Sequence, residues 1–383
     1  MSEIIQGDAL TILNDRFGDD SVQCCITSPP YWGLRDYKTG TWEGGAEDCN
    51  HTPRPQVSGS KTDSNSGALR DKPSNECKCG AIRIDQQLGL ETTPEDYVAK
   101  MVEVFREVRR VLKPDGTLWL NLGDSYNGYM ANQRATSISA TNQESRPEFE
   151  SGCGRRTADL KAKDLIGVPW RVAFALQADG WYLRCDIIWS KPNPMPESVT
   201  DRPTKAHEYL FLLSKSARYY YDAEAIQEQG VCEKLPGPNM TDTRETYGPQ
   251  NGGNSGLLDL RRRLIADKQS GHGRRHAGFN ERWDETEAAG RVNMRNKRSV
   301  WTIATQPYPE AHFATFPEKL VEPCVLAGCP AGGLVLDPFA GSGTVLAVAQ
   351  HLGREAVGIE LNADYIALAN VRMAQQGMML EAL

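Results

Sequence analysis

Short apolar runs closed by turn residues recur along this chain and constrain its fold more than any other feature. Runs of this length, bounded by Gly, Pro, Asn or Asp, are typical of buried strands. The sequence contains seven of them: Glu3–Gln6, Val22–Thr27, Thr117–Leu122, Leu183–Trp189, Glu208–Leu213, Leu334–Leu336 and Ala356–Ile359. Helical patterns lie between several runs, and the clearest ends at a predicted turn, Lys113–Gly116. This alternation predicts an α/β fold with a doubly wound, mostly parallel seven-stranded sheet.

Composition excludes several other classes of protein. The 383 residues are 39% hydrophobic, enough for a real core, and no apolar run reaches the roughly 18 residues that cross a bilayer. A secretion signal is not evident, so the ten cysteines indicate a reducing cytoplasm and not a disulfide framework. The formal net charge of −7 argues against a uniformly basic surface. A nucleic-acid site must therefore be a local patch.

A glycine turn follows one of the late strands. Asp337 ends the strand, and Gly341 and Gly343 lead into a predicted helix. Glycines there let the backbone approach a ligand closely. The third glycine of the dinucleotide fingerprint is replaced by Leu346, which disfavours NAD. Glu360 ends the next strand, where it can accept hydrogen bonds from two ribose hydroxyls. The pattern predicts a nucleoside ligand without a pyrophosphate.

A second polar motif, Ser28-Pro29-Pro30-Tyr31, follows an early buried strand. The Ser28 hydroxyl and the Pro29 carbonyl can both accept hydrogen bonds from one planar amino group, and Tyr31 offers an aromatic face for stacking. Ligands of doubly wound sheets bind where the strand order reverses. If Asp337 and Ser28 end the two strands at that point, the cofactor and the acceptor meet there.

The two motifs, in this order, resemble those of the S-adenosylmethionine-dependent DNA methyltransferases that modify exocyclic amino groups, in their circularly permuted β-class arrangement. That resemblance implies a Rossmann-like methyltransferase sheet, S-adenosylmethionine as cofactor and double-stranded DNA as substrate. It also implies a catalytic half at 1–221, an inserted target-recognition region at 222–298 and a cofactor-binding half at 299–383. The implied catalytic residues are Ser28, Pro29, Pro30 and Tyr31. The implied cofactor-binding residues are Asp8, Phe316, Asp337, Phe339, Gly341, Ser342, Gly343, Thr344, Glu360 and Asn362.

In this family, serine at the first position of the acceptor motif usually accompanies methylation of the 4-amino group of cytosine. We therefore favour N4 of cytosine, with N6 of adenine, or the same chemistry on RNA, as the alternatives. A base must leave the duplex to reach such a pocket. A catalytically silent DNA-binding protein is the rival from another class. A separate restriction endonuclease and a homodimer are further expected partners.

Three polar stretches divide the chain, at Thr52–Asn75, Tyr126–Ala158 and Leu235–Gly256, and we expect the second to be a flexible loop. Residues 261–298 carry eleven Lys/Arg against five Asp/Glu, a net charge of +6, with Phe279 and Trp283 among them. This mixture favours DNA contact over a merely solvated face.

A metal site is the last prediction. Cys49-Asn50-His51 and Cys77-Lys78-Cys79 offer four soft ligands in a polar insertion, 49–80, that has no core of its own. Zinc could supply the missing stability. One-residue spacers are shorter than usual in zinc sites, so thiols that fall in a polar loop by chance are the alternative.

Overall fold

The computed structural model describes residues 2–33, 37, 39–46, 48–51, 76–127, 160–230, 294–306 and 316–381. The chain divides into two compact units, Met1–Asp222 together with Arg298–Leu383, and Ala223–Lys297. Several expectations lie outside the described residues: the polar stretches at 52–75 and 235–256, nearly all of the stretch at 126–158, and most of the basic segment, with Phe279 and Trp283. Among the described helices, none is both long and apolar enough to span a bilayer.

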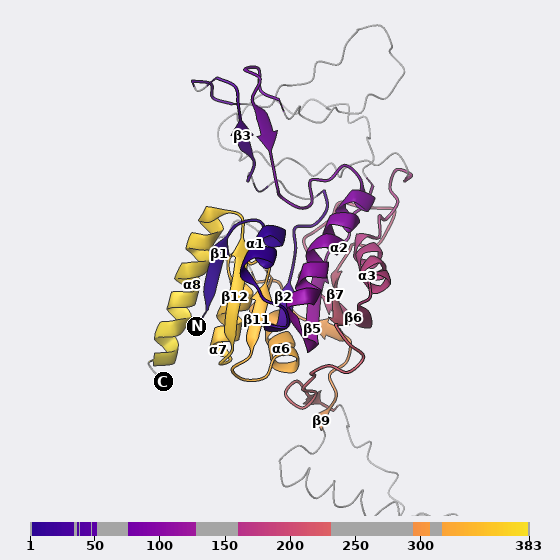
Figure 1. The fold of residues 1–383 in the computed structure, drawn as a ribbon. Coiled ribbons are helices and arrows are strands. Elements are labelled where there is room, and N and C mark those ends of the chain that lie inside the picture. Colours follow the sequence, from indigo (N-terminus) through magenta and orange to yellow (C-terminus); the bar gives the residue numbers. More distant parts are fainter. Residues whose placement is uncertain are drawn as a thin grey trace, which may run out of the picture. The chain divides into compact units, whose positions relative to one another are not determined.

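The first unit is built on one eight-stranded sheet (Figure 1). In spatial order its strands are β1 (Glu3–Gln6), β12 (Glu355–Glu360), β11 (Leu334–Asp337), β2 (Val22–Thr27), β5 (Leu112–Leu122), β7 (His207–Ser214), β6 (Tyr182–Ser190) and β10 (Val300–Thr302). All neighbours are parallel except β7, which is antiparallel to both β5 and β6. The doubly wound, mostly parallel sheet is confirmed. The eighth strand, β10, has only three residues and was too short to show a pattern.

Helices cover both faces of this sheet. One layer contains α1 (Ala9–Arg16), α2 (Pro94–Val111) and α3 (Val168–Ala178), and the other contains α6 (Glu318–Gly328), α7 (Thr344–His351) and α8 (Ala363–Glu381). Adjacent residues of β2 show the two faces, because side chains alternate along a strand. Cys25 lies in the core against α2, whereas the Cys24 sulfur lies where a Cβ on Gly328 of α6 would come within 2.8 Å.

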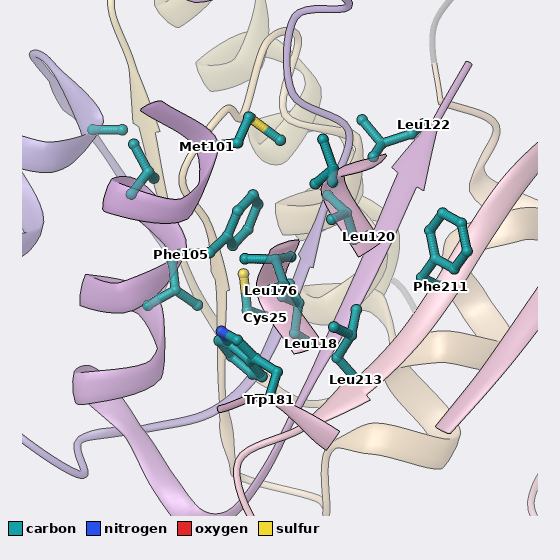
Figure 2. Close-up of a cluster of buried hydrophobic side chains, with 14 of the residues drawn as sticks. Cys25, Met101, Phe105, Leu118, Leu120, Leu122, Leu176, Trp181, Phe211 and Leu213 are labelled. Atoms are coloured by element: carbon teal, nitrogen blue, oxygen red, sulfur yellow. The ribbon is translucent and has the colours of Figure 1, made fainter. Parts of the chain in front are cut away.

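Helix α2 shows how the sequence specifies one of these layers. Thr93 caps its amino end by accepting a hydrogen bond from the Asp96 amide, and Pro94 occupies the first turn, where no amide partner is lost. Its apolar residues recur every three or four positions and are buried against β2, β5 and β7 (Figure 2). Phe105 is completely buried there, and its truncation to alanine would cost about 3–5 kcal/mol.

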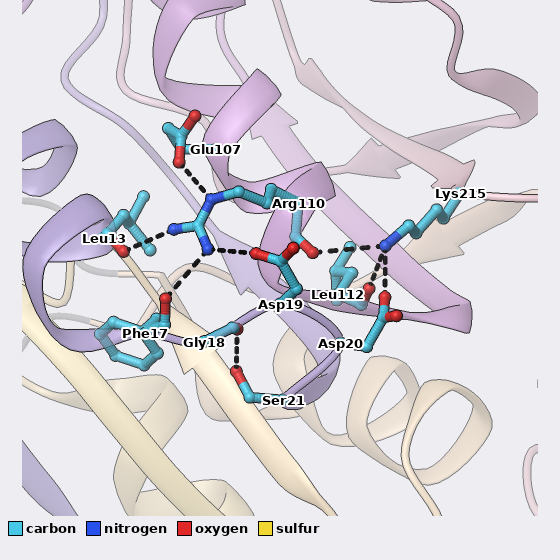
Figure 3. A network of polar contacts seen from close by, with 10 residues as sticks. All are labelled: Leu13, Phe17, Gly18, Asp19, Asp20, Ser21, Glu107, Arg110, Leu112 and Lys215. Atoms are coloured by element: carbon cyan, nitrogen blue, oxygen red, sulfur yellow. Dashed lines mark hydrogen bonds and ion pairs between the residues drawn. The ribbon is translucent and has the colours of Figure 1, made fainter.

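A polar network fastens α2 to the start of β2 (Figure 3). The Arg110 guanidinium donates to the carbonyls of Leu13 and Phe17 and pairs with Asp19, 2.6 Å away. Lys215 likewise pairs with Asp20 and donates to the Leu112 carbonyl. Asp19 and Asp20 precede β2, and Arg110 precedes β5. The contacts therefore lie at the amino ends of these strands, opposite the carboxyl ends where the cavity opens. They connect α2, the loop before β2 and the end of β7.

Two small antiparallel ladders complete the described structure. In the first unit, β3 (Thr41–Glu43) pairs with β4 (Ile82–Ile84) as a hairpin. In the second unit, β8 (Glu228–Gln229) pairs with β9 (Met294–Arg295), and Arg295 Nε donates to Glu228 Oε1 at 3.0 Å. The second unit occupies nearly the range that the sequence analysis assigns to target recognition. That role stays a prediction.

Candidate active site

A cavity of about 640 Å³ opens at the carboxyl ends of β2 and β11. The two strands are parallel neighbours, and the Thr27 hydroxyl of β2 donates to Asp337 Oδ1 of β11 at 2.6 Å. The strand order reverses at this pair, which is where open α/β sheets bind ligands. Twelve of the predicted site residues line the cavity: Asp8, Ser28, Pro29, Pro30, Tyr31, Phe316, Asp337, Phe339, Gly341, Ser342, Thr344 and Glu360. Ser28 and Asp337 thus line one cavity, as the sequence predicts.

The turn after β11 needs its glycines for two different reasons. Gly341 has φ +52°, and a Cβ there would meet nothing within 4 Å, so its lack of a side chain permits the conformation and leaves the cavity open. Gly343, with φ +74°, caps α7, and its Cβ would lie 2.8 Å from that of Ala369 in α8. Gly343 does not line the cavity. It lets two helices approach closely.

Two carboxylates form the acidic wall of the cavity. Asp337 is 3% exposed, and its Oδ1 accepts from Thr27 and from the Phe339 amide. Burial raises the Asp337 pKa to about 7, although these two donors oppose the shift. Burial also raises the Glu360 pKa, against hydrogen bonds from the amides of Asn362 and Gly341. A cation bound beside either carboxyl group would stabilise its ionised form.

A buried hydrogen-bond network holds the last residue of the motif Ser28-Pro29-Pro30-Tyr31, which we call the acceptor motif. The Tyr31 hydroxyl donates to Glu208 Oε2 at 2.8 Å and accepts from Asn121 Nδ2. Burial, and then the Glu208 charge, raise the Tyr31 pKa well above its usual value, so the hydroxyl remains a donor. Gly123 makes room for the ring, because a Cβ there would lie 2.6 Å from Tyr31 Cε2. The position of the aromatic face is therefore fixed from several sides.

Three members of this network were not assigned a role from the sequence: Asn121 of β5, Lys191 after β6 and Glu208 of β7. Lys191 forms an ion pair with Glu208 and lies over the Trp189 ring, 4.2 Å from its centroid. Asn121 is 1% exposed, and its Oδ1 has no hydrogen-bond partner among the described residues. A donor on a bound ligand would satisfy that oxygen. The sequence signal that could have identified Asn121 is its position as a polar residue in the otherwise apolar carboxyl end of β5.

The remaining predicted residues have structural contacts as well. Asp8 caps α1 by accepting from the amide and hydroxyl of Thr11, and it also lines the cavity. Asn362 lies just behind the wall, where its Nδ2 donates to the Tyr37 carbonyl at 3.4 Å. Phe316 lines the cavity, whereas the preceding positions, 312–315, lie outside the described residues.

The four predicted metal ligands lie together, away from the cavity lining. Their ligand atoms are all within 4.8 Å of one another, and they flank the β3–β4 hairpin. The residues are Cys49, His51, Cys77 and Cys79.

Fold and cavity together define a ligand-binding site at the point where the strand order of a doubly wound α/β domain reverses. The profile of the DNA methylase family N6_N4_Mtase matches residues 22–371, and the chain therefore belongs to this family of DNA amino-methyltransferases. The resemblance seen in the two motifs is thus confirmed.

Individual relatives agree with that membership. The chain is 39% identical to the type II methyltransferase M.Cfr9I of Citrobacter freundii, over 97% of this chain and 87% of the relative. It is also 39% identical to the type II methyltransferase M.SmaI of Serratia marcescens, over 98% of this chain and 91% of the relative. The solved PvuII DNA methyltransferase (cytosine-N4-specific) superposes with a TM-score of 0.51 and 16% identity, covering 97% of this chain and 86% of that one. This last likeness shows the fold.

Proposed function

We propose that the chain transfers the methyl group of S-adenosylmethionine to the exocyclic amino group of a flipped base in double-stranded DNA, at N4 of cytosine. The observation that carries this proposal is the 2.6 Å contact between Thr27 and Asp337, because it joins the acceptor motif and the glycine turn in one cavity. Family membership supports the reaction class.

The cavity residues fit S-adenosylmethionine. The cofactor is a nucleoside with a cationic sulfonium and no pyrophosphate, and when bound it supplies an electrophilic methyl group. Glu360 lies at the end of β12, where its carboxylate can accept from ribose hydroxyls. Asp337 and Glu360 together offset the positive charge, and Phe339 and Phe316 supply apolar wall. Because Gly341 has no side chain, the ligand can approach the protein backbone closely at this turn.

On the acceptor side, Ser28 Oγ and the Pro29 carbonyl would accept hydrogen bonds from the target amino group. Its nitrogen lone pair is delocalised into the ring, so attack requires a pyramidal nitrogen that gains positive charge. Acceptors fixed in the cavity stabilise that charge and set the angle of approach. Tyr31 would stack on the flipped base, with its hydroxyl anchored by Glu208 and Asn121.

Support for cytosine comes from Ser28, the residue type that accompanies N4 methylation in this family. The structural neighbour named as cytosine-N4-specific shares the fold and is consistent with that choice. A separate restriction endonuclease stays a proposed partner, and the relatives' description as type II methyltransferases supports this proposal. The second unit, Ala223–Lys297, is then the candidate for target recognition. A homodimer stays a prediction.

The test is identification of the modified nucleoside. Plasmid DNA treated with the purified chain and labelled cofactor is digested to nucleosides and analysed by mass spectrometry. We expect 4-methylcytosine. Finding 6-methyladenine would overturn the choice of base, and methylation of matched RNA but not DNA would overturn the substrate. Absence of transfer to either polymer, with cofactor binding intact, would leave the silent DNA-binding alternative.

A further inference from the structure

Four potential metal ligands flank the two strands of the β3–β4 hairpin. Cys49 and His51 follow β3, whereas Cys77 and Cys79 precede β4. The pairing of Glu43 with Ile82 is the last of the ladder before these residues. The two ligand pairs therefore close the hairpin at the end opposite Thr41 and Ile84.

The separations between the ligand atoms match a tetrahedral site. With zinc–sulfur bonds of about 2.3 Å, the edge of a tetrahedron is about 3.8 Å, and slightly less for a nitrogen ligand. Cys49 Sγ lies 3.6 Å from Cys77 Sγ, and Cys79 Sγ lies 3.2 Å from His51 Nδ1. The sulfur pair is much farther apart than the roughly 2.05 Å of a disulfide. All four atoms fall within 4.8 Å of one another.

A tight turn holds the backbone around Cys79. The Cys77 amide donates to the Ala81 carbonyl at 2.7 Å, and the Gly80 amide donates to the Cys77 carbonyl at 3.0 Å. These hydrogen bonds close the short loop that carries both Cys77 and Cys79, so the two ligand candidates lie in one turn.

Gly45 completes the enclosure on the other side of the turn. It has φ +82°, and a Cβ at this position would lie 2.6 Å from the Cys79 sulfur and 2.8 Å from the Ala81 Cβ. The chain from β3 can therefore close over the sulfur only without a side chain there. Two turns from distant parts of the sequence thus fit around one ligand atom.

Among the described residues of the β3–β4 hairpin, few apolar side chains are buried. Each strand has only three residues, and Ile82 and Ile84 are 52% and 40% exposed. The buried side chains at its closed end are Cys77 and Ala81, one of which is itself a ligand candidate. A two-stranded ribbon of this size is not stable on its own in water. Small units of this kind are commonly held by a metal.

We propose that Cys49, His51, Cys77 and Cys79 bind one structural Zn²⁺ ion. Three thiolates and one imidazole in a tetrahedron suit zinc better than harder cations such as Mg²⁺ or Ca²⁺. Four protein ligands complete the coordination, so no position remains for substrate or water, and the ion has no part in methyl transfer. The inference concerns a second site and does not depend on which base is methylated.

The ion also has a consequence for the cavity, because the open end of the hairpin forms part of the cavity wall. Thr39 and Asp85 line the cavity on either side of the ladder, and the Thr39 hydroxyl donates to Asp85 Oδ1 at 2.9 Å. The Gln87 side chain accepts from the Tyr37 amide at 2.7 Å. Zinc at the closed end fixes the register of β3 and β4 and thereby the position of these wall residues.

The first experiment measures metal content. The full chain, carrying an affinity tag without histidines and purified without chelators, is analysed for metals by plasma emission, and its thiols are counted before and after chelation. We expect one zinc per chain and three additional reactive thiols after chelation. A chain that contains no zinc and takes up none when zinc is supplied would overturn the proposal, as would stoichiometric iron in its place.

Variants separate metal binding from misfolding. Cys79→Ser and His51→Ala should lose zinc, whereas His51→Cys, which replaces the imidazole with a fourth thiolate, should retain it. Cys185→Ser, which alters a half-buried cysteine of β6 outside the cluster, is the control and should keep the full zinc content. The cobalt(II)-loaded chain should show tetrahedral visible bands and thiolate-to-cobalt absorption that weaken in Cys79→Ser. Zinc retained in both Cys79→Ser and His51→Ala would overturn the assignment.

Discussion

The candidate active-site cavity and the hairpin cluster of this chain are both groups of convergent polar side chains, but they are supported in opposite ways. Ser28, Asn121 and Asp337 follow or belong to strands that are buried at their carboxyl ends, so the sheet fixes them before any ligand binds. Cys49 and Cys79 flank three-residue strands with exposed isoleucines. The comparison teaches that a site on a packed sheet is preorganised, whereas a site on a short ribbon takes its order from its ligand.

The largest expected effect tests the preorganised side of this comparison. Ser28→Ala should lower kcat about 100–1000-fold, because its hydroxyl is assigned to the charge that develops in the transition state. Cofactor affinity should change less than about threefold. Single-turnover methylation with labelled cofactor and calorimetric binding would measure the two quantities.

The matched control for this variant is Ser21→Ala. It removes a hydroxyl that lies just before β2, at the end of the strand away from the cavity, and donates to the Gly18 carbonyl. Its kcat should remain near that of the wild type. Equal losses of turnover and cofactor affinity in Ser28→Ala would contradict the assigned role.

The next effect concerns the pH dependence of cofactor binding. Burial raises the Asp337 pKa from 3.8 to about 7. Between these two pH values the Asp337 carboxyl is protonated in the unliganded folded chain and ionised in the unfolded chain. The contribution of Asp337 to the free energy of unfolding is therefore greatest at low pH and is lost as the pH rises from about 4 to 7. A cationic cofactor favours the ionised form, so its affinity should fall by up to about tenfold per pH unit below 7. Calorimetry from pH 5.5 to 8.5 would measure this slope.

Asp337→Asn should bind the cofactor more weakly and lose most of that slope. Asp19→Asn, at the opposite edge of the sheet, should keep it. A slope in Asp337→Asn as steep as in the wild type would assign the proton to another group.

A smaller effect should follow from weakening the contacts of Tyr31. Glu208→Gln keeps an oxygen for the tyrosine hydroxyl but removes the charge paired with Lys191, and Tyr31→Phe keeps the stacking ring but removes the hydroxyl. Each should reduce kcat about three- to tenfold, or about 1 kcal/mol. Because both changes act on the same Tyr31–Glu208 contact, the double variant should lose little more than either single one. Additive losses would show that the two residues act separately.

The smallest expected effect separates the two regions directly. Chelation of zinc should leave the thermal midpoint of the main sheet within about 2 °C, because the hairpin contributes little to the buried core. Limited proteolysis should nevertheless become faster between residues 37 and 87, as mass spectrometry of the fragments would show. A large drop in the midpoint on chelation would mean that the metal supports the sheet itself.

Sequence patterns predicted the sheet well because its strands are buried and short, and Asp337 and Ser28 could be placed together from topology alone. Two short helices, α1 and α6, were not predicted. Pro323 lies inside α6, where a sequence reading expects a break, and α1 has only eight residues. The predicted turn at Lys113–Gly116 instead lies within β5, where the pairing with β2 shifts register.

The network around Tyr31 was not predicted for a different reason. Its members, Asn121, Lys191 and Glu208, are separated by tens of residues, and only the antiparallel insertion of β7 beside β5 brings Glu208 to Tyr31. Periodicity describes local structure, whereas such a contact depends on strand order. The hairpin cluster is the converse case, since the sequence showed its ligands but not their distances.

The pairing of β2 with β11 has a consequence for how the protein is made. Thr27 and Asp337, which touch in the folded chain, are 310 positions apart. At a synthesis rate of about 5–20 residues per second, the ribosome needs about 15–60 s to pass from one to the other. Throughout that interval the nascent chain carries the acceptor loop without a donor pocket and with one edge of β2 unpaired. Methyl-transfer activity can therefore arise only after β11 and its glycine turn have been synthesised, and β2 keeps an unpaired edge until then.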